Sequence, residues 1–126
     1  MQVLRDTNGF TLIEILIATV IITIASLGIA TLTGGVIRGN SFSKRLTTAT
    51  TLAQDRLEQV KRIGYTNSGT LAGTENYGDI PNYTGYKRVT SVTNNTPPMS
   101  NTRTVGVIVY WEADKHSVNL STILAE

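Results

Sequence analysis

One carboxylate stands out among the residues that could do chemistry, because its surroundings are apolar. Glu14 is the only charged residue between Asp6 and Arg38. The stretch around it, residues 9–32, otherwise consists of apolar, small and hydroxyl side chains. An ionised carboxylate in lipid or in an apolar core is costly unless a positive group pairs with it. We therefore expect Glu14 to have a specific function and a cationic partner.

The other reactive side chains do not form a catalytic or metal-binding set. His116 is the only histidine and the chain has no cysteine, so a zinc-type site lacks ligands. His116 lies in a predicted turn beside Asp114, which favours a solvated turn residue over a metal ligand. Ser41 and Ser43 have no histidine partner at a readable spacing. The sequence predicts no enzyme activity and no cofactor.

Length and charge bound the possible architecture. The chain has 126 residues and a net charge of +2, with acidic and basic residues interleaved. This balance does not by itself indicate a nucleic-acid partner. Once an apolar segment is set aside, the remainder is enough for one small domain.

Residues 10–38 form the predicted membrane-spanning or assembly helix. About 20 apolar residues match a hydrocarbon core of about 30 Å, and this run is longer. Three other interpretations remain: a cleavable secretory signal, an ordinary signal anchor, and the core helix of a soluble domain. A secretory signal would end its apolar region earlier, and a signal anchor leaves Glu14 unexplained.

A second, amphipathic helix is predicted at about 42–63. Its apolar residues recur at steps of three and four, and most of its charged residues lie off that stripe. Gly64 is predicted to end the helix, and a kink is plausible at Gly39-Asn40, where the two halves join. The apolar stripe comprises Phe42, Leu46, Ala49, Leu52, Ala53, Leu57, Val60 and Ile63.

The remaining residues predict a loop and then a sheet. Residues 64–85 are rich in Gly, Asn, Thr and Tyr and show no period long enough for an element, with a turn at Asp79-Ile80-Pro81-Asn82. Short connections favour antiparallel neighbours. Alternating patterns predict three strands, at Tyr86–Thr93, Thr102–Trp111 and Ser117–Leu124. On the second strand Val105, Val107, Val109 and Trp111 share one face.

The N-terminal residues carry a family resemblance. Gly9-Phe10-Thr11-Leu12-Ile13-Glu14, after a short polar leader and before a long apolar helix, resembles the start of type IV prepilins and pseudopilins. The strand pattern Val107-x-Val109-x-Trp111 is most similar to minor pilins of the PilV type and to small minor pseudopilins. The strong part of the resemblance covers residues 9 to about 32. It implies an α+β, type IV pilin-like fold: a long N-terminal helix, membrane-spanning and then amphipathic, packed on a small antiparallel sheet of about three strands.

The resemblance also implies a processing event. In that family a membrane prepilin peptidase cuts on the cytoplasmic side after the glycine at the place of Gly9, and the new amino group, at the place of Phe10, is N-methylated. The carboxylate of Glu14 would then meet the amino terminus of a neighbouring subunit, so that each charge satisfies the other in an apolar filament core. The domains implied are a leader at 1–9, a transmembrane and assembly helix at 10–38, and a soluble domain at 39–126 with helix 42–63, variable loop 64–85 and sheet 86–124.

The implied partners are prepilin peptidase, other pilin or pseudopilin subunits, the inner-membrane assembly platform and the lipid bilayer. The precursor would cross the inner membrane once, with its soluble domain outside the cytoplasm, before entering a pilus or pseudopilus. The basic residues that follow the span, Arg38, Lys44 and Arg45, oppose this orientation under the positive-inside rule, and the motif is given precedence. The chain also lacks the proline in the span and the disulfide that many pilins have.

Two function classes follow. The first is a structural subunit, a minor pilin or pseudopilin, of a type IV pilus or related filament. The second is a binding module for DNA or surfaces, and a type II secretion pseudopilin is a further alternative. Nucleic acid is a partner only under the binding-module alternative, and the charge balance does not support it. The candidate surface-binding residues are Tyr77, Tyr83, Lys87, Arg88 and Arg103.

Overall fold

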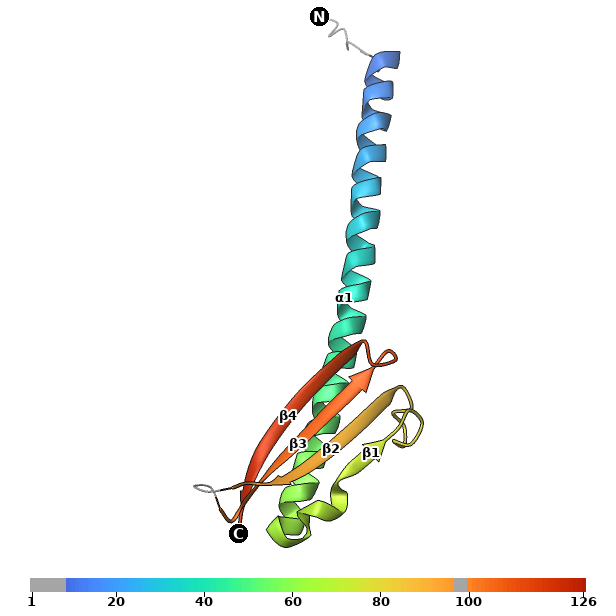
Figure 1. Ribbon diagram of the computed structural model, residues 1–126. Coiled ribbons are helices and arrows are strands. Elements are labelled where there is room, and N and C mark those ends of the chain that lie inside the picture. The colour runs from blue at the N-terminus through green and yellow to red at the C-terminus, as the bar shows by residue number, and fades with distance from the viewer. Residues whose placement is uncertain (1–8, 97–99) are drawn as a thin grey trace, which may run out of the picture. The chain divides into compact units, whose positions relative to one another are not determined.

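The computed structural model describes residues 9–96 and 100–126, and it has the α+β layout expected from the sequence (Figure 1). The residues form two compact units, divided between Ser41 and Phe42. The predicted leader, apart from Gly9, lies outside the described residues, as does part of the connection predicted after the first strand. The elements in chain order are α1 (Leu12–Asn67), the 3-10 helix η1 (Ser68–Leu71), β1 (Gly73–Glu75), β2 (Tyr86–Asn94), β3 (Thr102–Trp111) and β4 (His116–Ala125).

The first unit is the N-terminal part of α1. It is the one helix in the described part of the chain that is long and apolar enough to cross a membrane, by length and composition. Its hydroxyl groups do not interrupt the helix, because they donate hydrogen bonds to carbonyls one turn earlier. Thr23 Oγ1 donates to the carbonyl of Thr19 at 2.7 Å, and Ser26 Oγ donates to that of Ile22 at 2.8 Å. These hydroxyl groups are thereby satisfied within the helix.

Of the two predicted helix breaks, the one at Gly39-Asn40 is absent and the one at Gly64 is present. Gly39 and Asn40 have helical backbone, so α1 is not broken there. Gly64 breaks the helix with φ 75° and ψ 179°, as predicted, and a further short helical stretch, which the sequence did not predict, continues to Asn67. This backbone region is accessible almost only to glycine, which explains the residue type.

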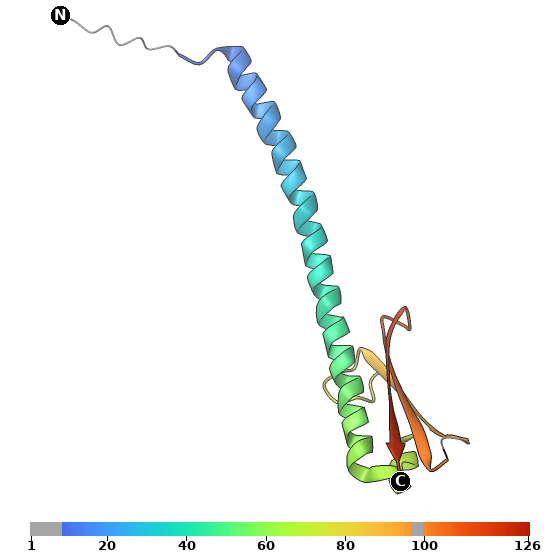
Figure 2. The same cartoon turned by 90° about the vertical axis from the view of Figure 1, so that its left-hand side faces the viewer.

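The second unit places the amphipathic part of α1 against a sheet (Figure 2). The centre of the predicted stripe is confirmed, because Ala49, Leu52, Ala53, Leu57 and Val60 are buried. The ends of the stripe are more exposed than predicted. Phe42, Leu46 and Ile63 retain 44%, 38% and 38% exposure.

The sheet is antiparallel throughout, with strand order β1-β2-β3-β4. The three predicted strands are confirmed to within two residues at their ends. On β3, Val105, Val107, Val109 and Trp111 are buried on one face, as the alternation predicts. Trp111 is 2% exposed, and these four side chains are the buried apolar residues that the sheet contributes to the core.

The predicted loop 64–85 contains more structure than its sequence indicates. It holds η1 and the short strand β1, which pairs with β2 and gives the sheet a fourth strand. Three residues are too few to display an alternating pattern, so β1 could not be read from the sequence. The predicted turn is confirmed: the N–H of Tyr83 donates to the carbonyl of Ile80 at 3.0 Å, and Asn82 has φ 66°.

Candidate functional site

The predicted processing junction lies immediately before α1. Gly9 and Phe10 precede the helix, and the Phe10 side chain is 80% exposed. A peptidase must bind its substrate backbone closely, so an exposed, non-helical junction with a glycine is accessible to one. The two residues predicted for cleavage and N-methylation are therefore adjacent and outside regular structure.

Thr11 caps the N-terminus of α1. Its Oγ1 accepts a hydrogen bond from the N–H of Glu14 at 3.3 Å, and its carbonyl accepts bonds from Glu14 and Ile15 at 3.1 and 3.2 Å. A side-chain acceptor at this position satisfies one of the amide groups left unpaired at a helix start. The sequence analysis missed this role of Thr11, although the signal was present: Thr11-Leu12-Ile13-Glu14 has the spacing of a capping box.

Glu14 occupies the third position of α1. A carboxylate in the first turn interacts favourably with the positive end of the helix dipole. Its side chain is exposed and makes no ion pair within residues 9–96 and 100–126. The predicted cationic partner of Glu14 is therefore not supplied by its own described residues, and the carboxylate is open to a partner.

Tyr77 and Lys87, two of the five candidate surface-binding residues, meet at Asp114. The Tyr77 hydroxyl donates to Asp114 Oδ1 at 2.9 Å and accepts from the Asp114 N–H at 3.0 Å. Lys87 forms an ion pair with Asp114, and its Nζ lies 4.6 Å from the ring centroid of Tyr110. The hydrogen bond from Lys87, followed by that from Tyr77, lowers the pKa of Asp114, and Asp114 in turn raises the pKa of Lys87.

The burial of Arg88 contradicts the surface role predicted for it. Arg88 is 6% exposed and donates to Glu75 through Nε at 2.6 Å and Nη2 at 2.8 Å. Its Nη1 donates to the carbonyl of Leu52 at 3.1 Å. Arg56 from α1 also pairs with Glu75, so one carboxylate joins α1, β1 and β2. The hydrogen bond from Arg88 is the main reason that the pKa of Glu75 is lowered.

Arg103 is engaged at the end of α1. Its Nη1 donates to the carbonyl of Tyr65 at 2.5 Å and to Ser68 Oγ at 3.0 Å, and its guanidinium lies 4.4 Å from the Tyr65 ring centroid. Tyr83 is 41% exposed, and its ring packs edge-on against Tyr86 at 6.3 Å. The structure thus brings Tyr77 and Lys87 together and places Arg88, Arg103 and Tyr83 elsewhere.

A polar and aromatic cluster at the β3–β4 hairpin was not predicted. Glu112, Ala113 and Asp114 all have positive φ, between 55° and 65°. Glu112 pairs with Arg45 and lies 3.5 Å from His116 Nε2. His116 is the first residue of β4 rather than a turn residue, and its ring stacks on Trp111 at 5.5 Å.

An open hollow of about 440 Å³ lies beside this hairpin. Its walls include Arg45, Tyr77, Tyr86, Trp111 and Glu112. In the described ranges no group of three His, Cys, Asp or Glu side chains could hold a metal ion.

The N-terminal segment matches a known family model. Residues 4–30 match the prokaryotic N-terminal methylation motif, which covers the predicted junction, Glu14 and much of the apolar part of α1. The match supports a type IV pilin-like prepilin N-terminus. No curated protein and no solved structure matches the chain.

Proposed function

We propose that this chain is a structural subunit, a minor pilin or pseudopilin, of a type IV pilus or a related filament. Prepilin peptidase cuts between Gly9 and Phe10, the new amino group of Phe10 is N-methylated, and the subunit assembles through its N-terminal helix. The observation that carries the proposal is the methylation motif at residues 4–30, placed at the start of an exposed apolar helix.

The segments take their roles from this proposal. Residues 1–9 are the leader, residues 10–38 cross the inner membrane and later pack in the filament, and residues 39–126 form the domain outside the cytoplasm. The partners are the peptidase, other pilin or pseudopilin subunits, the assembly platform and the bilayer. The accessible backbone at Gly9 and Phe10 supports cleavage there.

Glu14 acts in assembly by pairing with the amino terminus of a neighbouring subunit. Its carboxylate is exposed in the isolated chain and has no cationic partner among the described residues. In an apolar filament core a lone charge is costly, so a subunit in the wrong axial register is disfavoured. Pairing would thereby select the register of each added subunit.

The contacts of the basic side chains favour the structural subunit over the DNA-binding alternative. Of the three cations predicted to contact phosphate, Lys87 pairs with Asp114, Arg88 is buried against Glu75, and Arg103 holds the end of α1. Each would have to give up a satisfied interaction to bind DNA. We therefore expect little salt-dependent DNA binding.

The test is the mass of the mature chain isolated from the membrane of a host with an active prepilin peptidase. We expect a chain that begins at Phe10 and carries one added methyl group. Gly9→Leu should block cutting while leaving the chain in the membrane, and Gly28→Ala, in α1 away from the junction, should be cut normally. A wild-type chain that retains residues 1–9 in such a host would refute the proposal.

A further inference from the structure

The two edge strands of the sheet, β1 and β4, differ in how many backbone groups they leave open to another strand. Backbone groups in antiparallel strands point alternately to one neighbour and to the other. The N–H of Asn95 donates to the carbonyl of Thr102 at 3.0 Å. This bond fixes which residues of β2 direct their backbone groups toward β3 and which direct them toward β1. On β1 only Thr74 then directs its backbone groups away from β2. The flanking N–H groups are used internally, because Ala72 donates to Gly69 at 3.2 Å and Asn76 donates to Asp79 at 2.8 Å.

The β4 edge is open along its whole length. The N–H of Glu126 donates to the carbonyl of Asn101 at 3.1 Å, so even-numbered residues of this segment bond toward β3. The odd-numbered residues direct their N–H and C=O groups outward. They are Ser117, Asn119, Ser121, Ile123 and Ala125.

Nothing in β4 protects this edge. Natural proteins block exposed edge strands with charged residues, proline, bulges or very short strands. The ten residues His116–Ala125 contain no proline and no Asp, Glu, Lys or Arg, and they pair with β3 in continuous register. On the core side, Val118, Leu120 and Leu124 are only half-buried. The edge therefore offers both backbone groups and apolar surface to another strand.

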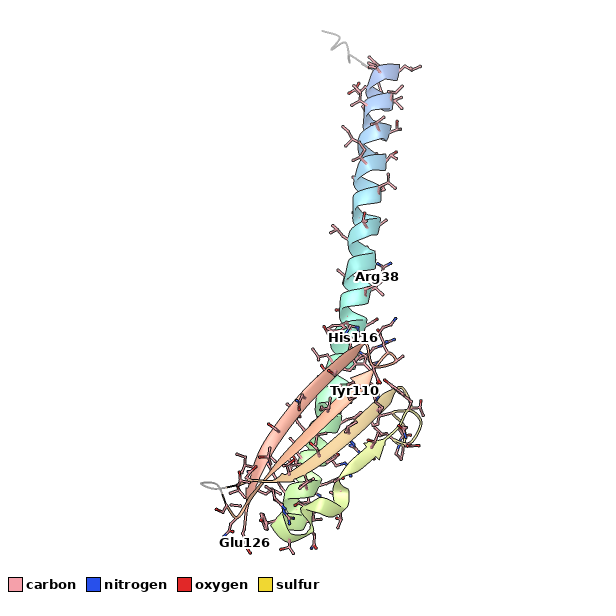
Figure 3. The ribbon with its side chains drawn as sticks, viewed as in Figure 1. Arg38, Tyr110, His116 and Glu126 are labelled. Atoms are coloured by element: carbon pink, nitrogen blue, oxygen red, sulfur yellow. The ribbon has the colours of Figure 1, made fainter. Side chains whose placement is uncertain are left out.

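The charges at the ends of β4 indicate which strand fits. Figure 3 shows His116 and Glu126 at opposite ends of β4. Lys115 and His116 stand at one end and Glu126 at the other. A parallel second copy would set the two Lys115 side chains, and the two Glu126 side chains, next to each other. An antiparallel second copy instead brings Lys115 next to Glu126 of the other copy. Opposite charges across a strand pair are stabilising and like charges are destabilising.

We propose that β4 pairs antiparallel with β4 of a second copy of this chain, with Ser121 at the two-fold axis. In this register Asn119 lies opposite Ile123 of the other copy, and both direct backbone groups across the interface. Val118 likewise meets Leu124 on the core side. The two sheets become one continuous sheet whose apolar face crosses the interface.

The symmetry restricts where such a pair can form. A two-fold axis perpendicular to the sheet reverses the direction of residues 42–67 of α1 between the two copies. Subunits of one filament are oriented alike, so the pair joins copies that belong to two different filaments. This step rests on the proposed function; the strand pairing itself requires neither cleavage nor filament assembly.

Cysteine cross-linking tests the pairing and its register, because the natural chain has no cysteine. Each variant is made in the uncleaved full-length chain, purified in detergent micelles and mildly oxidised. Ser121→Cys should form a disulfide-linked dimer, since residues at the axis face each other within disulfide range. Asn119→Cys alone should cross-link at least about fivefold less, because its two copies are offset by about 13 Å along the strands. Asn119→Cys mixed with Ile123→Cys should cross-link well.

Charge variants give an independent measurement by sedimentation. Ser121→Lys should abolish the dimer, because two ammonium groups meet at the axis, and an equal mixture of Ser121→Lys and Ser121→Glu should restore it. Thr93→Lys, exposed on β2, is the matched control and should dimerise like the natural chain. Native Trp111 emission in each variant verifies folding.

Three results would overturn the proposal. They are equal cross-linking of Ser121→Cys and Asn119→Cys, a dimer that survives Ser121→Lys, and a Ser121→Cys chain that folds but stays monomeric after oxidation. Failure of Gly9–Phe10 cleavage would refute the proposed function and leave these measurements unaffected.

Discussion

The N–H of Glu14 donates to Oγ1 of Thr11 across 3.3 Å. The charged residue of the motif is therefore hydrogen-bonded to the residue that caps α1. This relationship assigns two possible tasks to the Glu14 side chain. It can pair with a neighbour's amino terminus, or it can complete a capping box by accepting the N–H of Thr11. The two tasks make different demands on charge.

Substitutions at Glu14 separate these tasks. Pairing requires a negative charge, so Glu14→Gln and Glu14→Ala should both be processed normally and both be missing from sheared filaments. A capping box accepts Gln as well as Glu, so under that role Glu14→Gln would remain in filaments. Quantitative immunoblots of membrane and sheared fractions measure the distribution.

Thr11→Val and Thr11→Ser provide the matched comparison for the cap. The valine removes the acceptor and should destabilise the start of α1 by about 1 kcal/mol, while the serine retains it. Wild-type filament levels of both Glu14 variants would remove the assembly role of this residue altogether.

Glu75→Gln should destabilise the second unit by about 1–3 kcal/mol, because the largely buried side chains of Arg88 and Arg56 lose their shared carboxylate. Urea unfolding of the full-length chain in detergent, followed by Trp111 fluorescence, gives the free energy. Glu58→Gln is a suitable control, since its pair with Arg62 is exposed and should contribute little. Equal effects of the two substitutions would contradict the joining role of Glu75.

The free energy of unfolding should also depend on pH through Glu75. The pKa of Glu75 in the folded chain lies below its ordinary value of 4.5, so the folded state favours the ionised form. Its contribution is fully present above that ordinary value and is lost as the pH falls through the lower, folded-state pKa. The free energy of unfolding of Glu75→Gln should fall less steeply with acid below about pH 4.5 than that of the natural chain.

Gly64→Ala should destabilise the second unit by about 1–3 kcal/mol, because alanine is strained at φ 75° and ψ 179°. The space around the position is open, so a steric clash does not contribute. Gly39→Ala is the control, because Gly39 is helical and lies outside the second unit. Thermal unfolding of both variants measures the difference, and an unchanged midpoint for Gly64→Ala would contradict the strained geometry.

Tyr77→Phe should loosen the β3–β4 hairpin, since the N–H of Asp114 loses its acceptor. Hydrogen exchange at the Asp114 amide should become faster by at least about tenfold, in keeping with local opening of a loop. Tyr83→Phe, which removes the hydroxyl of an exposed loop tyrosine, should leave that amide unchanged. Equal exchange in both variants would show that Tyr77 does not hold the hairpin.

The elements with regular periods could be predicted from the sequence. The apolar run of α1, its amphipathic continuation and the alternation of Val105, Val107 and Val109 depend on the spacing of side chains along one segment. The repeat of a helix or a strand places residues with such spacing on one face, without reference to any distant residue. The capping pair Thr11 and Glu14 also depends only on local spacing, because the two residues are three positions apart, as in a capping box.

The contacts between distant residues were decided by the tertiary structure. Arg88 carries charge and was predicted to bind at the surface, yet it is buried, as is Arg56, because Glu75 reaches both from β1. The meeting of Tyr77 with Asp114, 37 positions later, likewise depends on the path of two loops. Burial of a charge depends on a partner, and only the folded chain determines which partner is within reach.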